Sequence, residues 1–478
     1  MAKKIFLVNK FYGGDSEASK TGLKGSYYYA DSVDFKTDLD ALTIQTAPVS
    51  DLTPSALVKW IEHDPVTGNI FAYAEDGSFY KKASGSWSTL TAATSSHGQG
   101  MKVWQDYVYL RKDSAIARYG PLSSSPSLTQ SWQSSNVQTI TDHAPILDFV
   151  GNLYFANGRY LGGWDGSTWT YNQVKLATGW NIRSLAIIGN KLSMGCWQGS
   201  NVYSLENGLL SLWDGTGQAG DGPTDFTYLA GAINAQGVID NTLFMVAGSV
   251  GNLYYYNGNV IKVRKINKQL TGSNYVEVFP GAMGTHAGDL IIGMGGNTDS
   301  TTLTQAVYAY GYTSKNYPRA MYIPYVISTG TKTGTGLRIG AVCGVGPNEF
   351  YIGWKDGSSY GVDLVTGTTP YSSATYQTLW FDDGQPHVQK ETDIIKFTFK
   401  PLRSGESFNF YYQIDRSGSW VALTPNTTPT TGDTEARCVI TPMVLWHEIQ
   451  FRVDLTTSGS TAPSLQSVSA VFGVREFI

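Results

Sequence analysis

The chain has 478 residues, of which 41% are hydrophobic and 15% are charged, and its formal net charge is −4 at pH 7. This length exceeds one small domain, and a composition with 30 Tyr and 13 Trp excludes a disordered chain. The negative balance argues against nucleic acid or an anionic membrane as the main partner. Aromatic residues on a framework with 53 Gly predict strands and turns, and therefore an all-β fold.

The N-terminus does not resemble a secretion signal. Lys3 and Lys4 are followed by only four apolar residues, Ile5 to Val8, whereas a signal peptide needs a longer apolar core. No apolar run approaches the ~20 residues of a membrane-spanning helix. We therefore expect neither export by the usual secretory route nor insertion into a membrane.

Two short patterns near the N-terminus suggest ligands but are incomplete. Residues 14–21 nearly match a phosphate-binding loop, but Ser19 replaces the second Gly and no helix-forming segment follows. The acidic cluster Asp31, Asp34, Asp38 and Asp40 lacks the regular spacing of a calcium loop. We expect no cofactor and no metal.

The cysteines and histidines agree with this expectation. Cys196, Cys343 and Cys438 are far apart, so we expect three free, mostly buried thiols and neither a zinc site nor a disulfide framework. The histidines are scattered singly, without metal-ligand spacing.

Internal repeats dominate the middle of the chain. Residues 151–158 (GNLYFANG) recur almost intact as residues 251–258 (GNLYYYNG), and Asp-Gly turns begin at Asp76, Asp165, Asp214 and Asp356. Their separations of 89, 49 and 142 residues fit units of about 47, within the range of propeller blades. Hairpins read along this region predict a β-propeller over residues 37–382, with seven blades and with six or eight as alternatives.

The repeats also predict how the propeller closes. We expect each Asp-Gly marker at an equivalent turn of its blade, and a strand within Asp38–Val49 to close the ring with the last blade. Lys262, Arg264, Lys265 and Lys268 form the one short basic run, which we interpret as the solvent face of a strand.

The pattern changes after Asp382. Alternating runs at residues 394–399, 407–413, 420–423, 438–440, 448–454 and 467–472 predict an antiparallel β-sandwich over residues 383–478. In the fifth run, Ile449, Phe451 and Val453 should face inward, with Gln450 and Arg452 outward. Residues 1–36 are then an N-terminal extension.

Nothing in the sequence favours an enzyme. Glycoside hydrolysis needs two convergent carboxylates, and the adjacent pairs Asp382/Asp383 and Glu391/Asp393 are candidates by proximity alone. The alternative is sugar recognition by exposed aromatic residues near loop tips, for which Trp164, Trp169 and Trp420 are the candidates.

Both ends of the chain resemble a known group of proteins. Residues 10–14 (KFYGG), 24–28 (KGSYY) and 32–35 (SVDF) are similar to the opening of minor structural proteins of tailed bacteriophages. Residues 415–420, 449–454 and 461–465 resemble the sandwich module of such tail proteins. The resemblance implies a structural protein of the virion tail, with no functional residue transferred. Its partners would be other virion proteins in a symmetric assembly, and host receptor or glycan binding is the alternative role.

Overall fold

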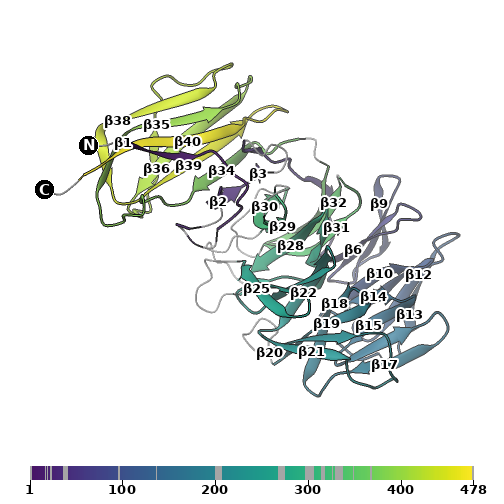
Figure 1. Ribbon diagram of the computed structural model, residues 1–478. Coiled ribbons are helices and arrows are strands. Elements are labelled where there is room, and N and C mark those ends of the chain that lie inside the picture. Colours follow the sequence, from purple (N-terminus) through teal and green to yellow (C-terminus); the bar gives the residue numbers. More distant parts are fainter. Residues whose placement is uncertain are drawn as a thin grey trace. The chain divides into compact units, whose positions relative to one another are not determined.

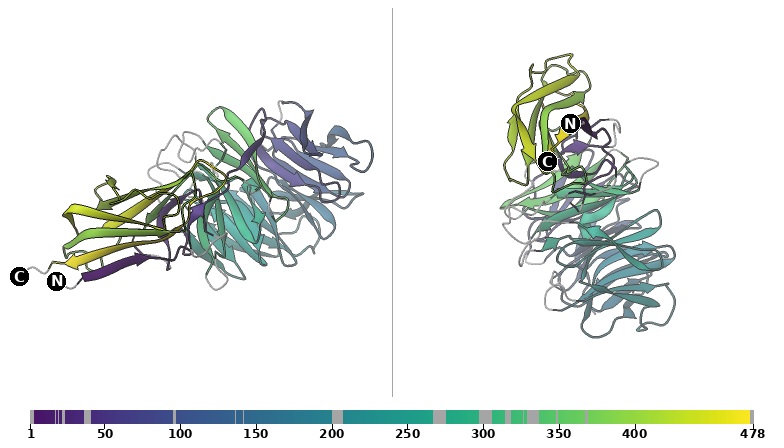
Figure 2. Two further views of the ribbon diagram at one scale, coloured as in Figure 1. Left: turned by 90° about the horizontal axis from the view of Figure 1, so that it is seen from above. Right: turned by 60° about the vertical axis from the view of Figure 1, so that its left-hand side comes forward.

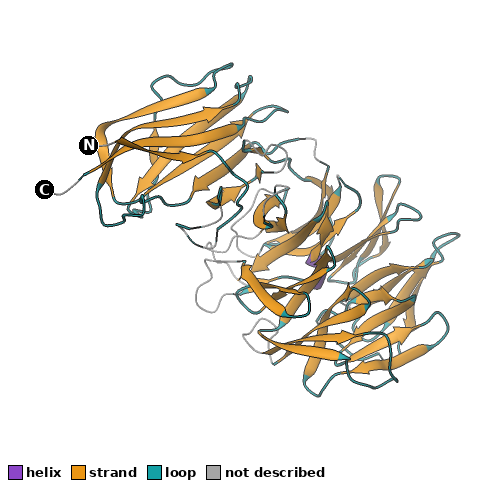
Figure 3. Cartoon of the chain, viewed as in Figure 1, coloured by secondary structure: helices purple, strands orange, loops and turns teal. Residues whose placement is uncertain are grey.

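The structure is a computed structural model of the chain. It describes all residues except 1–2, 17, 19, 22–23, 36–40, 95–96, 136, 141, 200–206, 267–274, 297–305, 314–317, 326, 329–336, 348, 367–368 and 476–478. Strands form nearly all of its regular structure, and the described residues contain one short 3-10 helix, η1 (Pro280–Ala282) (Figure 3). The all-β prediction is confirmed.

Seven sheets follow one another between residues 49 and 365 (Figure 1). The first sheet contains β6 (Val58–His63), β7 (Ile70–Ala74), β8 (Phe79–Ala83) and β9 (Ser86–Thr91). The second contains β10 (Gly100–Trp104), β11 (Tyr107–Arg111), β12 (Ile116–Gly120) and β13 (Ser127–Gln133). The third contains β14 (Ile146–Phe149), β15 (Asn152–Asn157), β16 (Tyr160–Trp164) and β17 (Trp169–Lys175). The fourth contains β18 (Trp180–Ile188), β19 (Lys191–Gln198), β20 (Asn207–Trp213) and β21 (Asp225–Ala230). The fifth contains β22 (Ile233–Ile239), β23 (Thr242–Ala247), β24 (Asn252–Tyr256) and β25 (Val260–Lys265).

The last two sheets depart from this simple order. The sixth has the order β26 (Val276–Glu277), β28 (Asp289–Gly296), β29 (Ala306–Gly311) and β30 (Ala320–Tyr325), with β27 (Met283–His286) also paired to β28. The seventh contains β31 (Arg338–Gly344), β32 (Phe350–Asp356) and β33 (Ser359–Val365), and its outermost strand is β5 (Val49–Leu52).

The sheets form a closed ring. Their inner strands contact one another in the cyclic order β6, β10, β14, β18, β22, β27, β31 and again β6. Sheets arranged radially in this way, each packed on its neighbours, define a β-propeller. Its last sheet is completed by β5, which precedes the first sheet in the chain and pairs with β33.

The closing strand lies later in the sequence than expected. It begins at Val49, where the expected segment Asp38–Val49 ends, and residues 36–40 lie outside the described residues. Leu42 and Thr46 form bridges with Leu465 and Pro370 instead. These bridges engage residues 42 and 46 with the C-terminal part of the chain, which leaves residues 49–52 to complete the last sheet.

The sequence repeats do not mark equivalent positions in the sheets. Gly151 lies in the turn before the second strand of its sheet, whereas Gly251 precedes the third strand of its own. Asp76 and Asp356 begin second turns, but Asp165 and Asp214 begin third turns. The expectation of equivalent turns is therefore wrong. Many hairpin turns place Gly at a positive φ, such as 78° at Gly151 and 63° at Gly251, so one motif serves turns at different positions.

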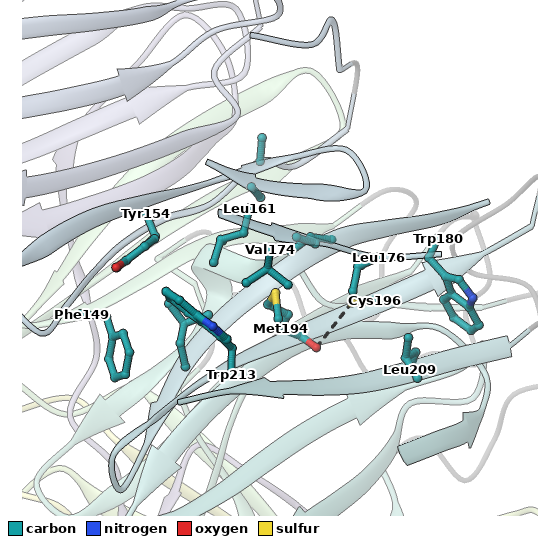
Figure 4. Close-up of a cluster of buried hydrophobic side chains, with 14 residues drawn as sticks. Phe149, Tyr154, Leu161, Val174, Leu176, Trp180, Met194, Cys196, Leu209 and Trp213 are labelled. Carbon is teal, nitrogen blue, oxygen red and sulfur yellow. Dashed lines mark hydrogen bonds between the residues drawn. The ribbon is translucent and has the colours of Figure 1, made fainter. Parts of the chain in front are cut away.

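Neighbouring sheets of the propeller share their hydrophobic cores. One cluster contains Phe149, Tyr154 and Val174 from the third sheet, and Met194, Cys196 and Trp213 from the fourth (Figure 4). The central strands are buried on both faces because each sheet packs on two others, as the uninterrupted burial of Ile70–Ala74 shows.

The chain divides into two compact units. The propeller unit comprises residues 48–307 and 327–366. The sandwich unit comprises residues 1–47, 308–326 and 367–478, so this division assigns β30 and most of β29 to it although both are strands of the sixth sheet. Residues 1–36, expected as an extension, and β34, which lies within the range expected for the propeller, thus belong to the sandwich unit. The partners of the two longer N-terminal strands lie hundreds of residues away, since Lys3 pairs with Gly473 and Tyr27 pairs with Thr378. No local pattern therefore indicates this placement.

The sandwich unit contains two main sheets. One has the order β1 (Lys3–Val8), β40 (Leu465–Val474), β35 (Lys390–Phe399) and β38 (Glu435–Trp446). The other has the order β2 (Tyr27–Asp31), β34 (Ser373–Thr378), β39 (Ile449–Thr457), β36 (Glu406–Ile414) and β37 (Val421–Leu423). A short pair, β3 (Val33–Asp34) and β4 (Thr43–Ile44), accompanies them. The six strands predicted after Asp382 are all present, and the N-terminal strand β1 runs beside the C-terminal strand β40 (Figure 2).

Aromatic rings fill the space between the two sheets. Phe397 on β35 stacks on Phe410 on β36, with ring centroids 4.0 Å apart, and Phe399 lies 4.8 Å from Phe408. Gln450, expected to face solvent, is buried. Its amide donates to the carbonyl of Thr378 at 2.7 Å, and its side-chain oxygen accepts from Gln413 at 2.6 Å. These hydrogen bonds satisfy the polar atoms of Gln450 and so compensate for their burial.

Candidate contact surfaces

A line of apolar side chains crosses the sheet β1-β40-β35-β38. Ile5 on β1 pairs with Val471 on β40. Val471 pairs in turn with Ile394 on β35, and Ile394 pairs with Val439 on β38. Residues paired directly across antiparallel strands point to the same face, so these four side chains form one row. We call Ile5, Val471, Ile394 and Val439 the apolar row.

The apolar row lies on the face directed away from the aromatic core. Its flanking residues in the same strands, among them Ala470, Ile395 and Cys438, are buried on the opposite face. Ile5 is 69% exposed and Val439 is 42% exposed, and the two central members are half-buried. Further exposed apolar residues on these strands are Leu7, Met443 and Leu445. A contiguous apolar surface of this kind indicates an interaction site.

Charges of opposite sign border the apolar row along β35. On one side, Lys396 pairs in register with Arg437 on β38, and we call these two residues the basic pair. On the other side lie Glu391 and Asp393, which we call the acidic pair. Residues of the opposite sign accompany both pairs: Glu435 lies beside Lys396, Arg475 beside Glu391 and Lys3 beside Asp393.

These charges also have partners within the sheet. Lys396 contacts Glu435 at 2.6 Å, Glu391 contacts Arg475 at 2.8 Å, and Asp393 lies 4.0 Å from Lys3. All three contacts are at least partly open to solvent, where such pairs contribute about 0–1 kcal/mol. They therefore leave these side chains able to meet a partner.

A second exposed surface is aromatic and lies on the propeller unit. Phe226 and Tyr228 project from β21, the outermost strand of its sheet, and are 55% and 65% exposed. Their ring centroids are 5.7 Å apart, and Tyr228 lies 5.9 Å from the buried Trp180. The three rings thus form a short aromatic strip that is open to solvent at the end formed by Phe226 and Tyr228. Sequence reasoning missed it, although the alternation of residues 225–230 (DFTYLA) places both rings on one face.

The tryptophans predicted to contact glycans are divided between the two units. Trp164 and Trp169 face each other on β16 and β17, and both pack against a hydrophobic cluster that includes Phe155. Trp164 lies 5.0 Å from Trp132, and Trp169 lies 5.0 Å from Phe155. Trp420 is half-buried and belongs to the sandwich unit. The structure therefore brings Trp164 and Trp169 together, as partly buried packing residues of the propeller unit.

The segment that resembles a phosphate-binding loop is engaged with carboxylates. Lys20 contacts Asp382 at 2.9 Å and Glu448 at 2.6 Å, and the bond to Glu448 contributes most to raising the pKa of Lys20. Strand β2 follows this segment, in place of the helix that a phosphate site requires. The paired carboxylates of the loop region are also divided between partners: Asp382 binds Lys20, and Asp383 binds Lys4 at 2.5 Å.

A cluster of buried charges joins inner strands of the propeller unit. Arg183 on β18 donates to one oxygen of Asp142, and the Nδ1 atom of His143 donates to the other at 2.8 Å. Burial lowers the pKa of His143 to about 3. Lys59 on β6 lies over the ring of Phe279, and burial also lowers the pKa of this lysine. Arg183 is balanced by Asp142, and Lys59 lies 3.7 Å from Glu75, which suits a structural role.

A hollow of about 440 Å³ lies at the ends of β22, β27 and β31. Asp240 and His286 are its titratable lining residues. One carboxylate does not supply the pair that glycoside hydrolysis needs. Within the described residues, no group of three or more His, Cys, Asp or Glu side chains is placed to hold a metal ion. The described residues also contain no helix that could span a membrane.

The comparisons with known proteins find only distant structural likenesses. No family model and no curated protein matches the sequence. Among solved structures, the extracellular domain of a one-component system from B. thetaiotaomicron is similar over 82% of this chain, with 13% identity and a TM-score of 0.46. This chain spans 49% of that structure's length.

Two further similar structures are propellers by description. The WD40 repeats of RRP9 match 68% of this chain, over 99% of their own length, with 11% identity and a TM-score of 0.43. The β-propeller domain of Cps50 (Swd1) from Myceliophteria thermophila matches 66% of this chain, over 99% of its own length, with 8% identity and a TM-score of 0.43. The ring of sheets in this chain itself defines a β-propeller protein, and these distant likenesses carry no activity or partner with them.

Proposed function

We propose that this chain is a structural component of a bacteriophage virion, located in the tail and assembled in the host cytoplasm. Its seven propeller sheets and its sandwich provide rigid contact surfaces for other virion proteins. The observation that supports this role is the apolar row, because an exposed apolar surface across a whole sheet is stabilised when a partner covers it. Many copies in one particle would multiply a modest affinity per contact. The proposal assigns no catalytic residue, cofactor or metal.

Purified particles test this role directly. Mass spectrometry should detect the chain in virions at a fixed copy number relative to the major tail proteins. Ile5→Asp combined with Val439→Asp should reduce incorporation, because it places two carboxylates in the contact surface. Val66→Asp is the matched control, since Val66 is 87% exposed in a turn of the propeller unit. Absence of the wild-type chain from particles would reject the role.

A second candidate function is recognition of host glycans by the aromatic strip of Phe226 and Tyr228. Exposed aromatic rings stack on the apolar faces of sugars, and the exposed Asp225 beside them could accept hydrogen bonds from hydroxyl groups. Phe226→Ala and Tyr228→Ala should then abolish binding on a glycan array. Tyr312→Ala, which removes an exposed tyrosine of the sandwich unit, is the control. An array without signal for the wild-type chain would reject this candidate.

A further inference from the structure

We infer that the outer face of the sheet β1-β40-β35-β38 binds a second copy of this chain across a two-fold axis that runs along the apolar row. This inference rests on the proposed role as a contact protein and names the partner of that surface. Its basis is the order of residues across the face: a basic pair, an apolar row, and an acidic pair.

The two-fold axis follows from this order. A rotation by 180° about the apolar row places each strand opposite the same strand of the second copy and reverses the strand direction. The apolar row of one copy then covers the apolar row of the other, as in an isologous interface. Two sheets packed face to face are about 10 Å apart, so the side chains of both rows meet.

The charges select this arrangement. The same rotation brings Lys396 on β35 of one copy opposite Asp393 and Glu391 on β35 of the other, while Arg437 lies on the neighbouring strand β38. Each contact occurs twice, once on each side of the axis. The alternative two-fold axis runs parallel to the strands, between β35 and β40. It would place Lys396 of one copy opposite Ser469 of the other, because these two residues pair across those strands. The complementary charges therefore favour the axis along the row and disfavour the alternative.

The surface is suited to an interface in two further respects. Both edges of the sheet contribute to it, since β1 and β38 are its outermost strands and carry its most exposed apolar residues. The residues are also held by a well-packed inner face: Ala470, Ile395 and Cys438 are at most 2% exposed. Because the packed inner face already holds these strands in place, binding costs little conformational entropy in the side chains and backbone of this surface.

The experiment is sedimentation equilibrium of the full chain over a range of concentrations. We expect a monomer–dimer equilibrium, and we expect Ile5→Asp with Val439→Asp to raise the dissociation constant by roughly tenfold or more. Val66→Asp, outside this face, should leave the constant unchanged. A wild-type chain that remains monomeric up to ~100 μM would overturn the inference, since a specific interface should be populated at that concentration.

Charge reversal tests the axis. Lys396→Glu alone and Asp393→Lys alone should each weaken the dimer by about tenfold, because each places like charges opposite one another. The double variant should restore the wild-type constant. Circular dichroism of each variant establishes that the sandwich remains folded. If the double variant is no tighter than the single variants, the proposed axis is wrong.

The outcomes separate this inference from the proposed function. A dimer in solution together with absence of the chain from particles would leave the interface standing and reject the virion role. A monomer in solution together with stoichiometric incorporation would reject self-association and leave a contact with a different virion protein.

Discussion

The imidazole of His143 is held against the carboxylate of Asp142, with Nδ1 2.8 Å from Oδ1. Arg183 donates to the other carboxylate oxygen. His143 is buried, its Nε2 atom makes no hydrogen bond within the described structure, and the ring lies 4.8 Å from Phe279. A neutral imidazole suits this position, because a second proton would add a buried charge without an acceptor.

The pair should make the propeller sensitive to acid. Burial lowers the pKa of His143 from 6.5 to about 3, so the unfolded chain binds a proton that the folded chain excludes between these values. The stability conferred by this residue is complete above pH 6.5 and is lost as the pH falls toward 3. Thermal unfolding measured from pH 7 to pH 4 should show a falling melting temperature, and His143→Asn should make that fall shallower. His97→Asn is the control, because His97 contacts Asp113 on the surface. Equal slopes for His143→Asn and the wild type would contradict the assignment.

Removing Arg183 should destabilise the propeller unit strongly. Arg183 is fully buried, and it and His143 are the main groups that lower the pKa of Asp142. The side chain of Asp142 is 31% exposed, so water partly solvates the carboxylate that remains, and losing the charged hydrogen bond costs about 1–3 kcal/mol. We expect Arg183→Met to lower the free energy of unfolding by that amount in urea. Arg416→Met, which removes a partly exposed contact to Glu448, should cost less than about 1 kcal/mol, and similar losses in both variants would refute the distinction.

Local patterns were sufficient to predict the strands but not their partners. The alternating runs at 394–399 and 448–454 appear as parts of β35 and β39. By contrast, Lys3 pairs with Gly473, and a contact across nearly the whole chain leaves no local signal. The same limit explains why residues 1–36 were expected to be an extension.

The sites were harder to predict than the strands. Trp164 and Trp169 follow the pattern of a turn flanked by aromatic residues, which is typical of exposed rings, but both rings pack against neighbouring aromatic side chains. Exposure depends on what the adjacent sheet supplies, and this cannot be read from the strand itself. The apolar row could not be predicted from any single strand either, because its four residues come from four separate strands.

The three thiols should react slowly in the folded protein. The cysteines are free, as expected, and Cys196 and Cys438 are buried while Cys343 is half-buried. Burial raises the pKa of Cys343 to about 12 and that of Cys438 to about 11, and it also raises the pKa of Cys196. Because the thiolate is the reactive form, labelling with a disulfide reagent at pH 8 should be slow until denaturant is added. Rapid labelling of one thiol in the native state would contradict this prediction.

Two N-terminal deletions should separate the roles of β1, β2 and β5. Deleting residues 1–47 removes β1 and β2, which pair with β40 and β34, but retains β5. The loss of Phe6 also removes a ring that lies 4.6 Å from Phe381 and 5.6 Å from Phe451. We therefore expect faster amide hydrogen exchange in β34 and β40, with exchange in β33 unchanged.

Deleting residues 1–52 additionally removes β5, the outermost strand of the last propeller sheet. Val362, Asp363 and Leu364 on β33 then lose the strand with which they pair, and the sheet has an open edge. Exchange in β33 should rise in this deletion and not in the shorter one, because exchange follows the local stability of each element. The two variants differ by five residues and both lack β1 and β2, so each is the control for the other. Equal protection of β33 in both variants would show that β5 does not hold the ring closed.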